Sequence, residues 1–126
     1  MSFSNYLETQ VLAHTFSNTA YTSPTTVYVG LFTSDPTDAD TGTEVSGGSY
    51  VRRAGSFTTS GNTATTSAAI EFPTATASWG TITHIGIYDA LSAGNLLAYA
   101  PLTAAKAIAS GDVFRIPTGD IDITLD

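Results

Sequence analysis

The amino-acid sequence predicts an all-β protein: an antiparallel β-sandwich or small barrel of about seven to nine strands with one N-terminal α-helix. Short segments rich in β-branched and aromatic residues recur along the chain, and Gly, Asn, Asp and Pro separate them. Because strands without intervening helices cannot easily make parallel crossovers, we expect the sheets to be mostly antiparallel. We expect residues 1–24 to form the helix and a linker, and residues 25–126 to form a single β-sandwich domain.

The one convincing helical pattern runs from Asn5 to Phe16. Asn5 is followed three residues later by Glu8, which has the form of a capping box at the helix start. Residues at helical spacing form one face, which consists of Tyr6, Leu7, Val11 and His14. A polar segment ending in Pro24 terminates the helix, because proline biases the residue before it toward an extended conformation.

The first strands follow this linker. The segment Thr26–Thr33 is apolar on both faces, which predicts a central strand covered on both sides. A polar loop from Asp35 to Ser49 comes next and is the longest stretch without a strand or helix pattern. We then expect Tyr50–Thr59 and Thr63–Phe72 to form a hairpin around Gly61 and Asn62.

The second half of the chain contains the clearest hairpin, from Trp79–Asp89 through a Gly-Asn turn to Leu96–Leu102. Its first strand should place Ile85 and Ile87 on one face and should place on the other face Ile82, His84 and Tyr88. The run Ala104–Ala109 is too short to nucleate a helix, so we interpret it as a strand or connector. Val113–Ile116 and Ile121–Leu125 complete the sequence. The last strand should direct inward Ile121, Ile123 and Leu125, and outward Asp120, Asp122, Thr124 and Asp126.

The composition excludes several function classes. The chain has 4 Lys and Arg residues against 11 Asp and Glu, a formal net charge of −7, and no Cys. Nucleic-acid binders need clustered cations, so we expect no nucleic-acid partner. Without Cys there is no disulfide framework and no thiolate site. The longest apolar stretch is interrupted by charged and polar residues, so we also expect no membrane partner. Ser and Thr make up 35 of the 126 residues, as expected for a hydrogen-bonded β surface.

Residues with chemical potential are few, and we predict no catalytic, cofactor or metal site from them. His14 and His84 lack the neighbours of a metal or catalytic motif, so packed or hydrogen-bonded roles fit them better. Asp35, Asp38, Asp40 and Glu44 crowd one loop, which suggests a calcium site, but the ligand spacing of a calcium loop is lost after Gly42. Turn-forming Asp residues explain the same pattern, and the sequence leaves open whether this Asp35–Glu44 loop binds a cation.

Two further features have a structural and a binding interpretation. Arg52 and Arg53 form the one basic dipeptide, which would either dock an acidic neighbour or form an intramolecular salt bridge. Trp79 and the dispersed Tyr residues could form an aromatic platform for a sugar. Core packing is the simpler interpretation, since most of them alternate with aliphatic residues.

An ordered set of segments resembles a known family. The set consists of Thr26-Val-Tyr-Val-Gly-Leu-Phe-Thr-Ser-Asp-Pro36, Thr43-Glu-Val-Ser-Gly-Gly-Ser-Tyr50, Phe72-Pro-Thr-Ala-Thr-Ala-Ser-Trp-Gly80, Ile82-Thr-His-Ile-Gly-Ile-Tyr-Asp89, Gly94-Asn-Leu-Leu-Ala-Tyr99 and Gly119-Asp-Ile-Asp-Ile-Thr-Leu125. It is similar to small tailed-phage virion proteins that are commonly labelled tail fibre proteins, some of which resemble capsid decoration (cement) proteins. The resemblance covers nearly the whole chain and implies an accessory virion component with no catalytic or metal residues.

The resemblance, together with a chain that has no heptads or repeats for a fibre shaft, favours a capsid decoration protein. Such a protein would bind the outside of the head and stabilise contacts between major capsid subunits. Its partners would be the major capsid protein and copies of itself, as a homotrimer suited to local three-fold sites. The alternative is a tail-fibre or baseplate accessory protein that contacts other tail proteins and contributes to host attachment. For the partner interface we nominate Tyr6, Leu7, Val11, Arg52 and Arg53, although a helix packed on its own sandwich is a competing interpretation.

Overall fold

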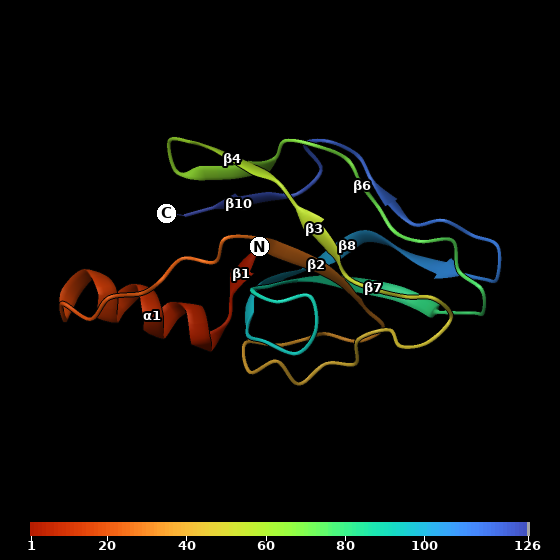
Figure 1. Cartoon of the computed structure of the whole chain (residues 1–126), viewed down its shortest axis with the longest axis horizontal. Helices are drawn as coiled ribbons and strands as arrows, with labels where there is room; N and C mark the ends of the chain where they lie inside the picture. Colours follow the sequence, from red (N-terminus) through yellow and green to blue (C-terminus); the bar gives the residue numbers. More distant parts are fainter. Residues whose placement is uncertain (126) are drawn as a thin grey trace.

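The computed structural model describes residues 1–125 and consists of one helix and ten strands arranged in two layers (Figure 1). The elements are β1 (Ser2–Phe3), α1 (Asn5–Phe16), β2 (Val27–Phe32), β3 (Arg53–Gly55), β4 (Phe57–Ser60), β5 (Thr63–Thr66), β6 (Ile70–Glu71), β7 (Gly80–Tyr88), β8 (Leu96–Ile108), β9 (Arg115–Ile116) and β10 (Asp122–Thr124). This confirms the predicted all-β sandwich with one N-terminal helix, and α1 has the predicted bounds.

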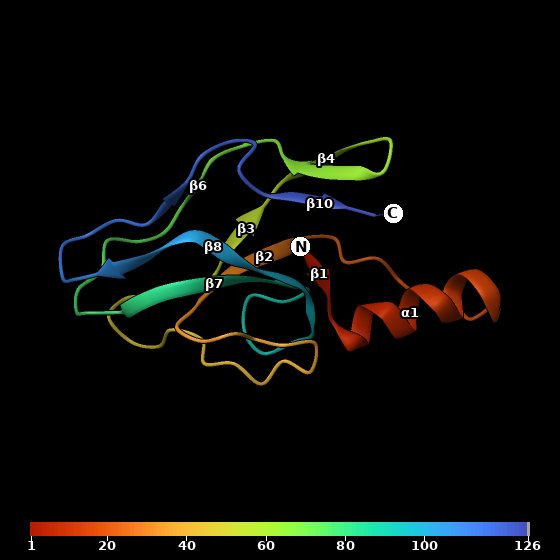
Figure 2. The same cartoon turned by 180° about the vertical axis from the view of Figure 1, so that it is seen from behind.

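The first layer is a five-stranded sheet in the order β1-β8-β7-β2-β3, with every neighbouring pair antiparallel. The long hairpin of β7 and β8 forms its centre, and β2 lies beside β7 (Figure 2). The predicted Ala104–Ala109 connector continues β8 as far as Ile108. Four of the six residues of β2 are buried, as the apolar character of both its faces predicted. The short β1 was not predicted, because two residues give no periodicity to recognise.

The second layer contains a three-stranded sheet, β10-β5-β4, and the pair β6-β9. Two predicted strands are each divided here. Tyr50–Thr59 breaks at Ser56 into β3, which pairs with β2, and β4, which pairs with β5. Thr63–Phe72 likewise breaks into β5 and β6. A chain that crosses from one sheet to the other must bend, and this bend ends the regular pairing. The two divisions and β1 explain why there are ten strands where about seven to nine were expected.

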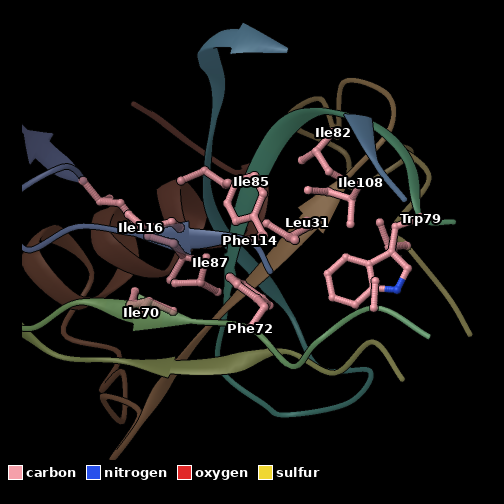
Figure 3. Packing of buried hydrophobic residues seen from close by; sticks show 14 of the residues in the cluster. Leu31, Ile70, Phe72, Trp79, Ile82, Ile85, Ile87, Ile108, Phe114 and Ile116 are labelled. Carbon is pink, nitrogen blue, oxygen red and sulfur yellow. The ribbon is translucent and has the colours of Figure 1, made fainter. Parts of the chain in front are cut away.

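The core lies between the two layers (Figure 3). The first layer contributes Leu31, Ile85 and Ile87, and the second layer and its loops contribute Phe72 and Phe114, whose rings meet edge to face at 5.8 Å. Ile82 also belongs to this cluster and is fully buried, so its predicted place on the opposite face of β7 is wrong. The reason is an irregularity in the β7–β8 register: Ile82 pairs with Lys106 but His84 pairs with Pro101, so the regular alternation of faces breaks between these residues.

The end of the chain follows its predicted alternation only in part. Ile121 is buried and Ile123 is partly buried, whereas Leu125 is 50% exposed and was wrongly predicted to point into the core. The strand β10 ends at Thr124, so Leu125 lies beyond the sheet that would cover it. The predicted outward position of Asp126 lies outside the described residues.

Candidate interaction surface

The helix α1 is fastened to the sandwich at its first residue. The N-cap is Ser4, whose Oγ accepts a hydrogen bond from the Leu7 N–H at 3.1 Å and donates one to the Leu96 carbonyl of β8. The predicted cap, Asn5 with Glu8, is therefore wrong by one position. Ser4 is the cap because it is buried against β8, where its hydroxyl forms hydrogen bonds with both the helix and the sheet. The Asn5 N–H also donates to the Asp38 carbonyl at 2.9 Å.

Beyond its first turn, α1 projects away from the sandwich (Figure 1). Of the predicted apolar face, Tyr6 and Leu7 pack against the core, whereas Val11 is 38% exposed. Leu12 is 58% exposed and Phe16 is 79% exposed. Within α1, all of which is described, no residue is fully buried. The nomination of Tyr6, Leu7 and Val11 for a partner interface stays a prediction. The most exposed apolar side chains of α1 lie on its outer turns, Thr9–Phe16.

The segment after α1 returns along the helix. His14 Nδ1 accepts a hydrogen bond from the backbone N–H of Tyr21 at 3.1 Å, which ties this segment to the last turn. His14 thus holds a backbone group, as its structural interpretation predicted. His14 itself is exposed, and the apolar residues Leu12 and Phe16 on the outer turns of α1 also stay exposed.

An apolar groove opens between the base of α1 and the sheet β10-β5-β4. Its volume is about 410 Å³. The side chains that line it come from the ends of both layers, and all of them are uncharged: Phe3, Leu7, Val27, Phe57, Thr59, Gly61, Asn62, Thr63, Ala64, Ile87, Leu97, Ala98, Ile123 and Leu125. The half-exposed Leu125 is one of them, so the side chain that leaves the core borders this groove. We call this set the apolar groove.

A second cluster is polar and surrounds Arg52. The Arg52 guanidinium is buried and forms a bidentate ion pair with Glu44. Its Nε donates to Glu44 Oε2 at 2.9 Å, and its Nη2 donates to Glu44 Oε1 at 2.8 Å. Its Nη1 donates to the carbonyls of Ala90 and Ala93 at 2.9 and 2.7 Å, and the guanidinium stacks over the Tyr88 ring at 3.6 Å. Of the two interpretations of Arg52, the structure shows the intramolecular salt bridge. Burial lowers the pKa of Arg52, but the hydrogen bond and charge of Glu44 outweigh it and raise the pKa overall.

Glu44 also receives the hydroxyl of Tyr50, which donates to Oε2 at 2.6 Å and accepts from the Leu31 N–H at 2.9 Å. Burial, followed by the hydrogen bond to Glu44, raises the pKa of Tyr50 far above its ordinary value. Gly30 makes room for this arrangement, because a Cβ there would lie 2.8 Å from Glu44 Oε2 and 3.1 Å from the Tyr50 hydroxyl. We call Glu44, Tyr50, Arg52 and Tyr88 the arginine cluster.

Arg53, the other half of the dipeptide, is exposed on β3, an edge strand of the main sheet. A charged side chain at such an edge discourages pairing with a strand of another molecule. Its nomination for a partner interface stays a prediction.

The acidic loop is held by hydrogen bonds to separate partners. Tyr88 donates to Asp40 Oδ1 at 2.6 Å, Tyr99 donates to Asp38 Oδ1, and the Asp35 Oδ1 accepts from the Thr37 N–H at 2.9 Å. Burial and then the bond to Asp40 raise the pKa of Tyr88. Among residues 1–125, no three His, Asp or Glu side chains come together in a way that could hold a metal ion. Asp35 thus forms a local turn, as the turn-forming interpretation predicted, whereas Asp38 and Asp40 hold the loop against the sheet.

The remaining candidates also have structural roles. His84 Nδ1 lies 2.8 Å from the Thr83 hydroxyl, and its Nε2 lies 4.0 Å from Asp35 Oδ1. Trp79 is buried, donates from Nε1 to the Gly48 carbonyl at 2.9 Å, and meets Tyr50 edge to face at 5.4 Å. Core packing, the simpler interpretation of Trp79, is therefore the one that the structure shows.

Sequence reasoning missed Ser4 and the apolar groove. Ser4 carries a signal that was available, since Ser is among the preferred N-cap residues and lies directly before the helix. The groove joins residues from the beginning, middle and end of the chain, so no local pattern could reveal it. A half-exposed apolar residue after a strand, such as Leu125, is its one trace in the sequence.

The fold and this surface define a class: a small antiparallel β-sandwich with a projecting helix and an apolar groove beside it. Within residues 1–125, no helix has the length and apolar character needed to cross a membrane. A family model described as podophage GP4 fiber I protein gp80 matches residues 2–124, so the chain belongs to this Gp80 family of phage fibre proteins. The resemblance to a tailed-phage virion family is thereby confirmed, and the protein is a virion structural protein. No curated protein matches the chain.

Proposed function

We propose that this protein is a non-enzymatic structural subunit of the phage tail-fibre apparatus that contributes to host-surface attachment. The observation that carries the proposal is the match to a fibre protein family over residues 2–124. In this role the partners are other tail proteins and copies of the chain itself.

The geometry supports an assembly role. The arginine cluster and the acidic loop find their hydrogen-bond partners within the chain, so their polar groups are already used on one face of the main sheet. The apolar groove lies on the other face at the base of α1, and Leu12 and Phe16 are exposed on the outer turns of this helix. Exposed apolar patches of this kind mark contact surfaces between proteins.

Capsid decoration is the head-bound alternative that the sequence analysis favoured. It predicts a different place on the virion and a different copy number, whereas the chemistry of the surface would be the same. The family description names a fibre, and for this reason we place the protein on the tail in our proposal. A homotrimer stays a prediction for either location.

Cryo-electron microscopy of purified virions tests the location, combined with quantitative mass spectrometry of copies per particle. We expect density that fits the β-sandwich on the tail and a copy number in the range of a tail component. The major capsid protein, quantified in the same sample, provides the internal scale. Density on the head lattice with hundreds of copies, in proportion to the capsid protein, would overturn the tail assignment in favour of decoration.

A further inference from the structure

We propose that the outer turns of α1, Thr9–Phe16, occupy the apolar groove of a second copy of the same chain. The occupant is thus this chain's own helix, supplied by a neighbour. Tyr6 and Leu7 fix the base of the helix on its own sandwich, and Leu12 and Phe16 enter the neighbour's groove.

The helix needs a partner to account for its length. An isolated helix of 12 residues is marginal in water, and helices in proteins gain most of their stability from packing an apolar face. The outer turns of α1 lack such packing in the single chain: Leu12 and Phe16 are more than half exposed. Burying both side chains against another apolar surface would supply the missing stabilisation.

The groove has the chemistry to receive these side chains. Every described residue that lines it is uncharged, and most of the lining is aliphatic or aromatic. Release of water from such a groove lowers the free energy when an apolar side chain takes its place. The exposed Leu125 and the partly buried Phe57 and Ile123 stand at its border and lack cover from the single chain.

The absence of charge on both surfaces fits a second copy as the occupant. The chain has a net charge of −7, so two copies repel each other over most of their surfaces. The segment Thr9–Phe16 contains no Asp, Glu, Lys or Arg, and neither does the described lining of the groove. Here two copies can approach without burying a charge. A membrane surface fits less well, because helices that lie on membranes carry Lys or Arg on their polar face and α1 carries none.

The placement of the helix allows an exchange between copies. Ser4 holds the start of α1 on β8, and Leu7 lines the rim of its own groove. The helix then leaves the sandwich on the side where β4 and β10 also project (Figure 1). Helix and groove are therefore neighbours on one face. Two copies can exchange helices reciprocally, or several can close a ring in which each helix enters the next groove.

Sedimentation analysis of the purified full-length chain over a range of concentrations tests the assembly. We expect a concentration-dependent oligomer, either a reciprocal dimer or a closed ring. The double variant Leu12→Glu with Phe16→Glu should raise the dissociation constant by roughly 100-fold or more, because it places charges in the groove. The control Leu91→Glu changes a residue that is 54% exposed elsewhere and should leave assembly unchanged. A wild-type chain that stays monomeric at every concentration overturns the proposal, as does a double variant that assembles like the wild type.

Disulfide trapping identifies the contact itself, because the chain has no Cys. The Phe16→Cys and Thr59→Cys chains are prepared separately, one of them with a tag so that the two differ in mass, and are then mixed and oxidised. Thr59 lines the groove on β4, so the two should form a mixed disulfide at least tenfold more often than Phe16→Cys with the control Thr58→Cys. Equal trapping by Thr58→Cys overturns the proposal. A double variant that cross-links within one chain at high dilution also does, because the helix would then occupy its own groove.

The exchange is a property of the chain in solution and does not depend on where the protein sits on the virion. If the chain assembles through α1 but lies on the head, the tail assignment fails and the exchange stands. If the protein lies on the tail but the purified chain is monomeric, the exchange fails and the tail assignment stands.

Discussion

The two faces of the main sheet differ in how their side chains are covered. On one face, the polar face, Glu44 and two backbone carbonyls hydrogen-bond Arg52, and its guanidinium stacks over the Tyr88 ring. On the other face, to which the adjacent residue Ile87 points, the apolar groove is open to solvent, and Leu12 and Phe16 of α1 are exposed. The polar side chains find their partners within the single chain, whereas the apolar groove and the outer turns of α1 do not.

This difference separates residues that hold the fold from residues that are free to bind. A buried guanidinium whose three nitrogens are all hydrogen-bonded within the chain has little left to offer a partner. Exposed apolar side chains lack such partners and lose unfavourable hydration when another protein covers them. Substitutions on the polar face should therefore change stability, and substitutions on α1 and in the apolar groove should change assembly.

The largest expected effect on stability comes from removing the Glu44–Arg52 ion pair of the arginine cluster. Glu44→Ala leaves the Arg52 guanidinium buried without its counter-charge and removes the acceptor of the Tyr50 hydroxyl. We expect a loss of about 3 kcal/mol in the free energy of unfolding, measured by chemical denaturation, because an unpaired buried charge is costly. Glu44→Gln, which keeps the shape and one acceptor oxygen, should lose less.

Arg53→Ala is the matched control, because Arg53 is adjacent in sequence but exposed on β3. It should change the free energy of unfolding by less than about 0.5 kcal/mol, as exposed substitutions usually do. If Glu44→Ala is as mild as Arg53→Ala, the arginine cluster does not stabilise this face of the main sheet.

The sequence was sufficient to predict the fold class because its signals are local. The apolar character of both faces of β2 and the Gly-Asn turns of the hairpins act over a few residues, and the structure keeps both. The bounds of α1 were also predicted, although its cap was wrong. The cap depends on the burial of Ser4 against β8, which lies 92 residues away.

The two clusters escaped prediction because they join distant segments. Arg52 was recognised as a candidate for docking or for a salt bridge, but Glu44 as its partner and the carbonyls of Ala90 and Ala93 follow from the loops that enclose it. The irregularity at Ile82 reversed a face assignment, because alternation along a strand fails where the register with its neighbour breaks. Such positions depend on tertiary structure that no single segment encodes.

A smaller effect on stability is expected at the base of α1. Ser4→Ala removes the N-cap of α1 and the hydrogen bond to the Leu96 carbonyl. We expect a loss of about 1–2 kcal/mol in the free energy of unfolding, together with reduced helical circular dichroism. Asn5→Ala is the control, because only the backbone of Asn5 is used by the acidic loop, and it should be nearly neutral. A larger loss for Asn5→Ala would restore Asn5 as the functional cap.

The last and smallest effect concerns Tyr99, which joins the acidic loop to β8. Its hydrogen bond to Asp38, followed by partial burial, raises the pKa of Tyr99 from 10.0 to about 12. A raised pKa means that the folded state keeps a proton that the unfolded state loses above pH 10. The stabilisation by Tyr99 is therefore complete below pH 10 and is lost as the pH rises through about 12.

The pKa values of Tyr50 and Tyr88 are raised as well, so these residues add to the loss of stability at alkaline pH. The wild type should therefore lose stability steadily as the pH rises above 10. Tyr99→Phe should make the loss between pH 10 and about 12 shallower, measured by denaturation at each pH. Asp38→Asn, which removes the charge of the group that accepts the Tyr99 hydroxyl, should make the same part of the pH profile shallower. An unchanged slope for Tyr99→Phe would mean that Asp38 does not hold the Tyr99 proton in solution. The acidic loop would then be attached to the sheet through Asp40 and Tyr88, and the closed polar face would extend no further than the arginine cluster.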